Sequence, residues 1–245
     1  MAETNFPTEL IELPSKGKLY PKESPLSTGK VEMRYMSAAD EDLLTNQNYI
    51  EKGIVVDKLL QNLIVDKNID YSQLLVGDKN ALLIAARILG YGKSYTFTYM
   101  GEETEIDLAQ IQDKPMHEVI KNATENRFSY TLPASNRVIE FKLLTHADEV
   151  MIEQELKGLK KLGKEIVPEL STRLKYMILS VDGNEDRKVC RDFAENMLAR
   201  DAREFRKYVA EIQPDVDLKF YPENGPASGV QIPIGITFLY PDFEA

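Results

Sequence analysis

Two short motifs in the sequence resemble parts of ligand-binding loops, and neither is complete. Gly92-Lys93-Ser94 matches the last three positions of a phosphate-binding loop, but Arg87 stands where that loop requires its first glycine. A helix is expected before this motif and a strand after it, which reverses the order that aims a helix N-terminus at a phosphate. We therefore interpret the motif as the end of a helix.

The run from Asp182 to Asp186 resembles the beginning of a calcium-binding loop. Arg187 and Phe193 occupy the positions that would need the turn glycine and the bidentate glutamate. We interpret this run as a solvated turn that caps the helix after it.

The residue types most often used in catalysis are few and scattered. The one cysteine, Cys190, is expected inside a helix as a buried, unreactive thiol, with no histidine near it in sequence. His146 is expected in a first helical turn and His117 in a loop. The sequence therefore predicts no catalytic residues, no cofactor and no metal ligands, and we expect a protein that is not an enzyme. An enzyme with a dispersed site remains the least favoured alternative.

Charge and composition narrow the classes of partner. The 245 residues include 30 Lys and Arg against 40 Asp and Glu, which gives a net charge of -10. This balance disfavours nucleic acid, since binding of the phosphate backbone needs a basic face. The longest apolar run, residues 81–86, is far shorter than a membrane span, and no export signal is recognised at the N-terminus. We expect no membrane contact, no small-molecule substrate and no disulfide.

Hydrophobic periodicity predicts an α+β fold of antiparallel β-hairpins and small sheets packed with helices. Helices are expected from Ser37 to Leu44, over 53–65 and over 79–89, the last capped by Asp78 and buried nearly all round. The period then changes to two, which predicts one hairpin at 94–99 with 104–108 and a second at 128–132 with 138–143.

The C-terminal half is predicted to be mainly helical. The stretch from Thr145 to Ile212 is expected to hold helices at 150–162 and 189–212, followed by strands at 216–221 and 230–240. These elements suggest three segments: an extended arm with a first strand at 1–35, helices and hairpins at 36–143, and a helical segment closed by a hairpin at 144–245. One continuous domain is the alternative.

Both ends of the chain carry candidate contact residues. Apolar side chains stand at every second position from Val230 to Tyr240, and Pro233 restricts such a strand to a sheet edge. Cover by the protein's own helices and cover by a partner are both open. The arm carries large side chains with no helix of its own to pack on. We therefore expect protein-interface residues at Leu13, Leu19, Tyr20, Val230, Ile232 and Tyr240.

Several strings, in order along most of the chain, resemble the T4-like bacteriophage baseplate protein family. They are Leu13 to Pro21, Met36 to Leu44, Leu74 to Lys79, Arg87-Ile88, Gly90-Tyr91-Gly92, Ile106-Asp107-Leu108 and Phe238 to Asp242. Some members of the family place cysteine pairs near two hairpin turns. Here those turns read Tyr99 to Glu102 and Tyr221 to Gly225, without cysteine, so a metal-binding ribbon is not expected.

The resemblance implies a non-enzymatic tail protein, a component or assembly factor of the baseplate hub of a contractile tail. Its partners would be other phage baseplate or hub proteins. Its place would be the host cytoplasm during assembly, and then the virion baseplate if the protein is retained. The alternative from another class is an acidic adaptor or binding protein unrelated to phage tails. Retention in the virion and oligomeric state remain open.

Overall fold

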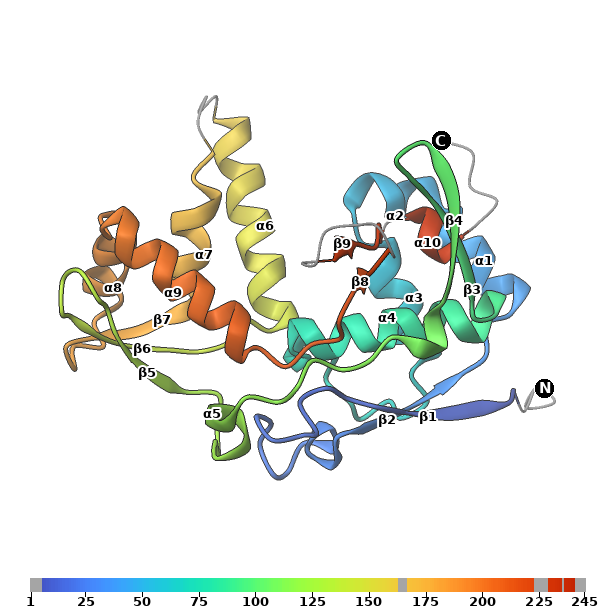
Figure 1. Ribbon diagram of the computed structural model, residues 1–245, viewed down its shortest axis with the longest axis horizontal. Coiled ribbons are helices and arrows are strands. Elements are labelled where there is room, and N and C mark those ends of the chain that lie inside the picture. Colours follow the sequence, from blue (N-terminus) through green and yellow to red (C-terminus); the bar gives the residue numbers. More distant parts are fainter. Residues whose placement is uncertain (1–5, 163–166, 223–228, 235, 241–245) are drawn as a thin grey trace.

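Two groups of elements rise side by side from a common base (Figure 1). The structure is a computed structural model that describes residues 6–162, 167–222, 229–234 and 236–240. Helices combine with small antiparallel sheets, which confirms the expected α+β class. In these ranges no helix has the length and apolar character needed to cross a membrane.

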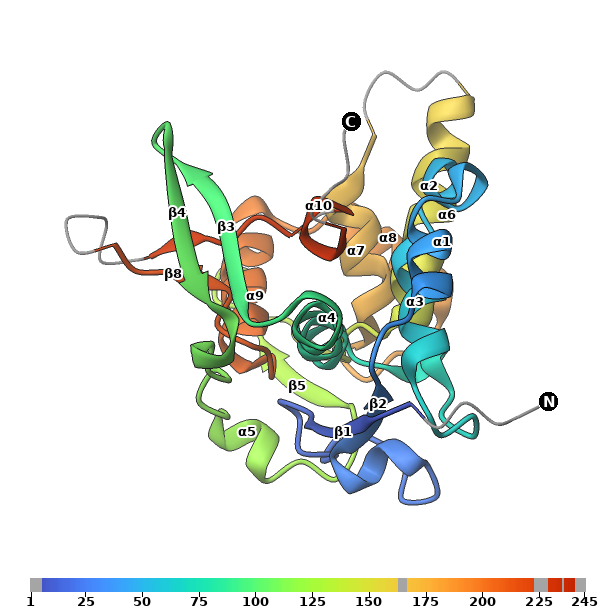
Figure 2. The same cartoon turned by 90° about the vertical axis from the view of Figure 1, so that its right-hand side faces the viewer.

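The first group is built around helix α4 (Val76–Tyr91). Figure 2 views α4 nearly end-on, with strands on one side of it and helices α1 to α3 on the other. Leu82 and Ala86 of α4 are fully buried, so the expectation of a central buried helix is confirmed. The other elements of this group are α1 (Ala38–Leu44), α2 (Gln47–Lys52), α3 (Val55–Leu63), β3 (Ser94–Tyr99), β4 (Glu102–Asp107), β8 (Lys219–Phe220), β9 (Val230–Gln231) and α10 (Ile236–Leu239).

The second group packs four helices against a three-stranded antiparallel sheet of order β5-β6-β7. Phe141 of the central strand lies edge-to-face with Phe205, their ring centroids 4.9 Å apart, and both side chains are fully buried. The elements are β5 (Phe128–Thr131), β6 (Val138–Phe141), α6 (His146–Lys161), α7 (Glu169–Met177), β7 (Ile178–Val181), α8 (Arg187–Glu195) and α9 (Ala199–Ile212).

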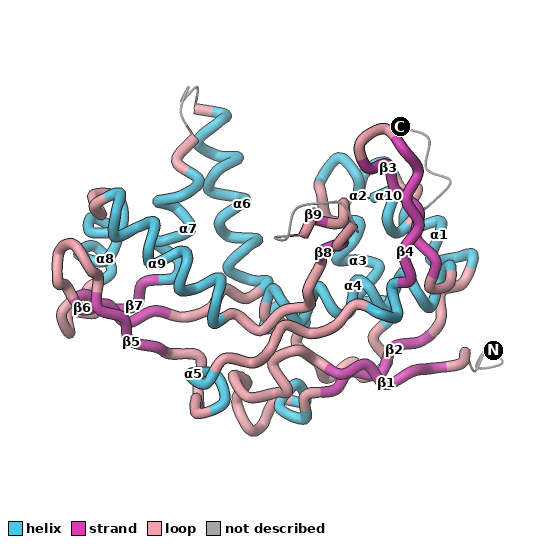
Figure 3. Tube along the Cα trace, in the orientation of Figure 1, coloured by secondary structure: helices cyan, strands magenta, loops and turns pink. Residues whose placement is uncertain are grey.

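The base is formed by the N-terminal segment and the link between the two groups. Strands β1 (Thr8–Glu12) and β2 (Lys30–Arg34) pair antiparallel below α4, and α5 (Glu118–Lys121) lies beside them (Figure 3). Three 3-10 turns complete the chain path: Pro25–Thr28, Tyr71–Gln73 and Leu108–Gln110. The starts of α4 and α6 are joined directly, since Val76 donates its N–H to the carbonyl of Leu144 and His146 donates to Leu74.

The predicted N-terminal arm is not an exposed arm. Leu13, Leu19 and Tyr20 are all buried in the protein's own core, so the premise that they have nothing to pack on is wrong. Asp78 explains part of this arrangement. The sequence predicts Asp78 as the cap of α4, and this prediction is wrong: the N-cap is Leu75, and Asp78 lies in the first turn. Its carboxylate instead accepts hydrogen bonds from Ser15 and Tyr20.

The predicted strand over 230–240 is also wrong. Among the described residues of this range, only Val230–Gln231 pairs as a strand, and Ile236–Leu239 forms a short helix. The neighbours Phe238 and Leu239 are both fully buried, an arrangement that a half-buried edge strand, with side chains alternating between a covered and an open face, does not give. Pro233 between the two pieces cannot donate a ladder hydrogen bond.

Other differences concern the C-terminal half. The stretch predicted as helical contains strand β7, and the single helix expected over 189–212 is two helices, α8 and α9. A four-residue apolar strand such as Ile178–Val181 cannot be told from a helical segment by periodicity alone. Two expected features, the loop around Gly225 and the end of the resemblance at Pro241-Asp242, lie outside the described residues.

Candidate functional site

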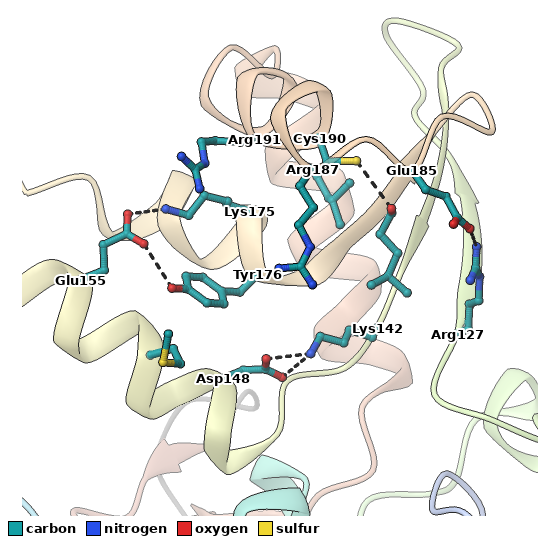
Figure 4. A pocket seen from close by; sticks show the side chains of 13 residues that line it. Arg127, Lys142, Asp148, Glu155, Lys175, Tyr176, Glu185, Arg187, Cys190 and Arg191 are labelled. Carbon is teal, nitrogen blue, oxygen red and sulfur yellow. Dashed lines mark hydrogen bonds and ion pairs between the residues drawn. The ribbon is translucent and has the colours of Figure 1, made fainter.

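An open cleft of about 490 Å³ lies in the second group, between α6, α7, α8 and the edge of the three-stranded sheet (Figure 4). Its lining is rich in cations for a chain with a net charge of -10. We call it the cationic cleft and define it by five residues: Arg127, Lys142, Lys175, Arg187 and Arg191. No property of the sequence around any one of these residues singled it out, because they come from two helices, α7 and α8, and from the segments just before β5 and just after β6.

Three of the five cations are paired with carboxylates. Lys142 binds both oxygens of Asp148 at 2.7 and 2.8 Å, and Lys175 pairs with Glu155. Arg127 donates to Glu140 at 2.6 Å and also contacts Glu185. Hydrogen bonds from Arg127 and Ser180 lower the pKa of Glu140, so this pair stays charged at neutral pH. These pairs fix the walls of the cleft.

The remaining two cations, Arg187 and Arg191, have no carboxylate partner among the described residues. They stand one helical turn apart on α8, and both line the cleft. Figure 4 shows Arg187 reaching toward Tyr176 and Lys142, and Arg191 beside Lys175. Both side chains are exposed and available to a ligand.

The floor of the cleft is largely apolar. Ile178 and Cys190 are buried there, whereas Met151 of α6 is 50% exposed at the side. Burial raises the pKa of the Cys190 thiol, and its sulfur lies 3.6 Å from the carbonyl oxygens of Leu179 and Asn184. The thiol is therefore protonated at neutral pH, which agrees with the expected buried cysteine and disfavours nucleophilic chemistry.

A second polar cluster lies where α3, α4 and α6 meet, and the sequence reasoning missed it. Lys79 pairs with Asp57 at 2.5 Å, Tyr71 donates to the same carboxylate at 2.9 Å, and His146 Nε2 lies 3.7 Å from it. Burial lowers the pKa of His146 and raises that of Tyr71. Because these groups satisfy one another, we interpret the cluster as a link between helices rather than a reaction centre.

The turn that resembled a calcium loop acts as a helix cap, as predicted. Asp186 is the N-cap of α8 and accepts from the N–H groups of Lys188 and Val189. Asp182 is paired with Arg137. In the ranges that the structure describes, no group of three or more Asp, Glu, His or Cys side chains is placed to hold a metal ion.

The expected interface residues do not gather on one surface. Leu13, Leu19, Tyr20 and Ile232 are buried, Tyr240 is half-buried against the core, and Val230 is half-buried in strand β9. The buried four are at most 6% exposed, so little of their surface is open to a partner. The most exposed large apolar side chain among the described residues is instead Met100, at 86%, in the turn between β3 and β4.

Comparisons with protein-family models, curated proteins and solved structures return no match.

Proposed function

We propose that this chain is a non-enzymatic protein of a bacteriophage contractile tail, a component or assembly factor of the baseplate hub that acts through protein–protein contacts. The observation that carries the proposal is that the sequence strings on which the family resemblance rests lie in contact with one another in the fold. Strings separated by tens of residues in sequence contact one another around α4.

The first of these contacts joins the N-terminal string to the start of α4. Ser15 donates to Asp78 through both its N–H, at 2.9 Å, and its hydroxyl, at 2.6 Å. Tyr20 donates to the same carboxylate at 2.6 Å and accepts from the N–H of Leu75 at 2.9 Å. We call Ser15, Tyr20 and Asp78 the N-terminal clamp.

The second contact joins the string at Met36 to Leu44 with the end of α4. A side chain at Gly90 would place its Cβ 2.4 Å from the sulfur of Met36, so this glycine permits the close approach. Tyr91 next to it donates to Glu41 at 2.8 Å. Residues of separate strings thus pack on and bond to the same helix, which supports resemblance to a folded unit over chance similarity of short strings.

Two exposed features support action through contacts. The β3–β4 hairpin projects from the first group (Figure 2), and its turn carries Met100 at a φ of +50°. Such a turn favours Asn or Gly, so an exposed Met is unfavourable there without another role. The cationic cleft is the second feature, on the other group of elements.

Co-expression with the baseplate hub proteins of a T4-like phage, followed by sedimentation, tests the proposal. We expect the chain to sediment with hub proteins or with an intermediate of hub assembly. The matched comparison is the Met100→Asn variant, which keeps the turn and removes the exposed apolar side chain. If hub complexes form and sediment without the wild-type chain, and their yield does not depend on it, the proposal is wrong. The unrelated-adaptor alternative would then be favoured.

A further inference from the structure

We propose that the cationic cleft binds an acidic segment of a partner protein, with two carboxylates held by Arg187 and Arg191. This inference rests on the proposed function only for the identity of the partner. The acidic and aliphatic character of the partner segment follows from the residues that line the cleft.

The placement of the two arginines is electrostatically unfavourable in the chain alone. Arg187 is the first residue of α8, where the positive end of the helix dipole repels a cation. The Asp186 carboxylate at the N-cap offsets part of this repulsion, and the first turn itself carries no acidic residue. Arg191 is one turn further along, and like charges at this spacing destabilise a helix by a few tenths of a kcal/mol. A carboxylate bound between the two arginines would reduce both the repulsion from the helix dipole and the repulsion between the two guanidinium groups.

The surrounding pairs keep this positive charge available. Asp148, Glu155 and Glu185 in the lining are engaged by Lys142, Lys175 and Arg127 respectively. Those pairs neutralise the three acids, so Arg187 and Arg191 remain as the excess positive charge of the lining. Arginine also presents a planar fork of donors that matches a carboxylate with two parallel hydrogen bonds.

The same lining favours a peptide over a nucleic acid. Three carboxylates at the wall would repel a backbone that carries a charge at every residue, whereas separate side-chain carboxylates can be placed between them. Half-exposed Met151 and the apolar floor can pack an aliphatic side chain of the same segment. The ligand expected is therefore a segment that combines acidic and aliphatic residues.

Titration of the ¹⁵N-labelled full chain tests this inference. The probe is a synthetic peptide in which two glutamates alternate with leucines, and its control has glutamine in place of both glutamates. We expect the glutamate peptide to shift the arginine Nε–H signals of Arg187 and Arg191 and the amide signals of α8. The glutamine peptide should bind at least tenfold more weakly.

Two double variants locate the site. R187Q with R191Q should weaken binding of the glutamate peptide at least tenfold. R203Q with K207Q removes two cations at the same spacing on α9, outside the cleft, and should change binding less than twofold. Equal binding of the two peptides, or an equal loss in both double variants, would overturn the proposal. So would tighter binding of a single-stranded oligonucleotide that displaces the peptide from α8.

The assay separates this inference from the proposed function, because it contains no phage protein. Peptide binding that depends on Arg187 and Arg191, together with failure to sediment with hub proteins, overturns the proposed function alone. Sedimentation with hub proteins by a chain that binds neither peptide overturns the cleft proposal alone.

Discussion

Asp78 is a buried carboxylate that accepts its hydrogen bonds from residues of the N-terminal segment, Ser15 and Tyr20. Burial raises its pKa, and the hydrogen bonds from Ser15 and Tyr20 act in the opposite direction. The hydroxyl of Tyr20 is itself committed twice, as donor to Asp78 and acceptor from Leu75. A buried polar group left without its partner costs about 1–3 kcal/mol, so each member of the N-terminal clamp depends on the others.

The Tyr20→Phe variant tests the clamp. It keeps the ring and removes only the hydroxyl. The Leu75 N–H then loses its acceptor, and Asp78 Oδ2 loses one of its two donors and keeps the Ser15 hydroxyl. We expect a loss of about 2 kcal/mol in the free energy of unfolding, measured with urea. Tyr221→Phe is the matched control, because its hydroxyl also binds an aspartate, Asp217, at 2.8 Å but on the surface. Equal losses in the two variants would contradict the role given to the clamp.

The sequence made the opposite prediction for this residue, and the reason is physical. The prolines around Tyr20 identify an irregular segment, and irregular segments are more often exposed than buried. The residue that decides the matter, Asp78, lies 58 positions away. Its sequence context, just before an apolar helix, is equally typical of a helix cap. Local patterns carry no information about which distant segment a carboxylate will bind.

At the scale of elements, helix α1 is fixed by charge as well as packing. Ser37 and Asp40 form a capping box, and Arg34 binds both oxygens of Asp40 at 2.7 and 2.8 Å. Burial alone would raise the pKa of Asp40. The hydrogen bonds from Arg34 and Ser37 outweigh it and lower the pKa from 3.8 to about 2.

The pH dependence of stability follows from this depressed pKa. A carboxyl group whose pKa is lower in the folded state than in the unfolded state stabilises the protein at pH values above the unfolded-state pKa. This contribution is lost as the pH falls through the folded-state pKa. We expect Asp40 to contribute on the order of 2 kcal/mol at pH 7, and this contribution to disappear between pH 4 and pH 2. The difference in unfolding free energy between the wild type and Asp40→Asn should shrink over that range. Asp42→Asn, on the exposed side of α1, is the matched surface control.

Two helical glycines differ sharply in the space around them. A Cβ at Gly77, in the first turn of α4, would lie 1.9 Å from the carbonyl oxygen of Pro214. A Cβ at Gly158 in α6 would meet nothing within 4 Å. Gly77 therefore permits a close approach of two backbones, whereas Gly158 only weakens its helix.

Alanine at each position should have opposite effects. Gly77→Ala should destabilise the protein by about 3 kcal/mol, because backbone atoms must move to admit the methyl group. Gly158→Ala should stabilise it by about 0.5–1 kcal/mol, the difference in helix propensity. Thermal unfolding of both variants against the wild type provides the measurement. A stable Gly77→Ala variant would contradict the close packing of α4 on the 214–215 segment.

Secondary structure was predicted correctly from the sequence wherever one hydrophobic period, helical or strand-like, was sustained. The helix at α1 with its Ser37 cap and the hairpins β3–β4 and β5–β6 were predicted close to their observed bounds. The cationic cleft was not predictable, because it depends on strand β7, which lies in a stretch that the sequence predicts only as mostly helical. Without that strand, α7 and α8 have no fixed relation, and Lys175 and Arg187 cannot be placed together.

For the whole molecule, the two groups of elements share one contiguous core. Its buried apolar residues run from Leu13 to Leu239, and the main-chain bonds between the starts of α4 and α6 cross from one group to the other. We therefore expect a single cooperative unfolding transition, which would favour one continuous domain over the three segments suggested by the sequence.

Tryptophan reporters test this expectation, because the chain contains no tryptophan. Tyr99→Trp reports on the first group, where Tyr99 packs against Phe220, and Tyr208→Trp reports on the second, where Tyr208 stacks on Tyr130. The fluorescence midpoints in urea should coincide with each other and with loss of far-UV circular dichroism. Separate midpoints, or a plateau between them, would show that the groups unfold independently.

The burial of Phe238 also constrains the order in which the molecule can be completed during synthesis. Its ring lies 4.9 Å from that of Tyr95, and the hydroxyl of Tyr95 donates to the carbonyl of Pro233, 138 residues later in the chain. At about 5–20 residues per second, translation needs on the order of 10 s to cover that separation. Throughout this interval the aromatic face of the β3–β4 hairpin has been synthesised, but α10, which covers it in the folded protein, has not. Any protein present at the ribosome can meet that face before α10 does.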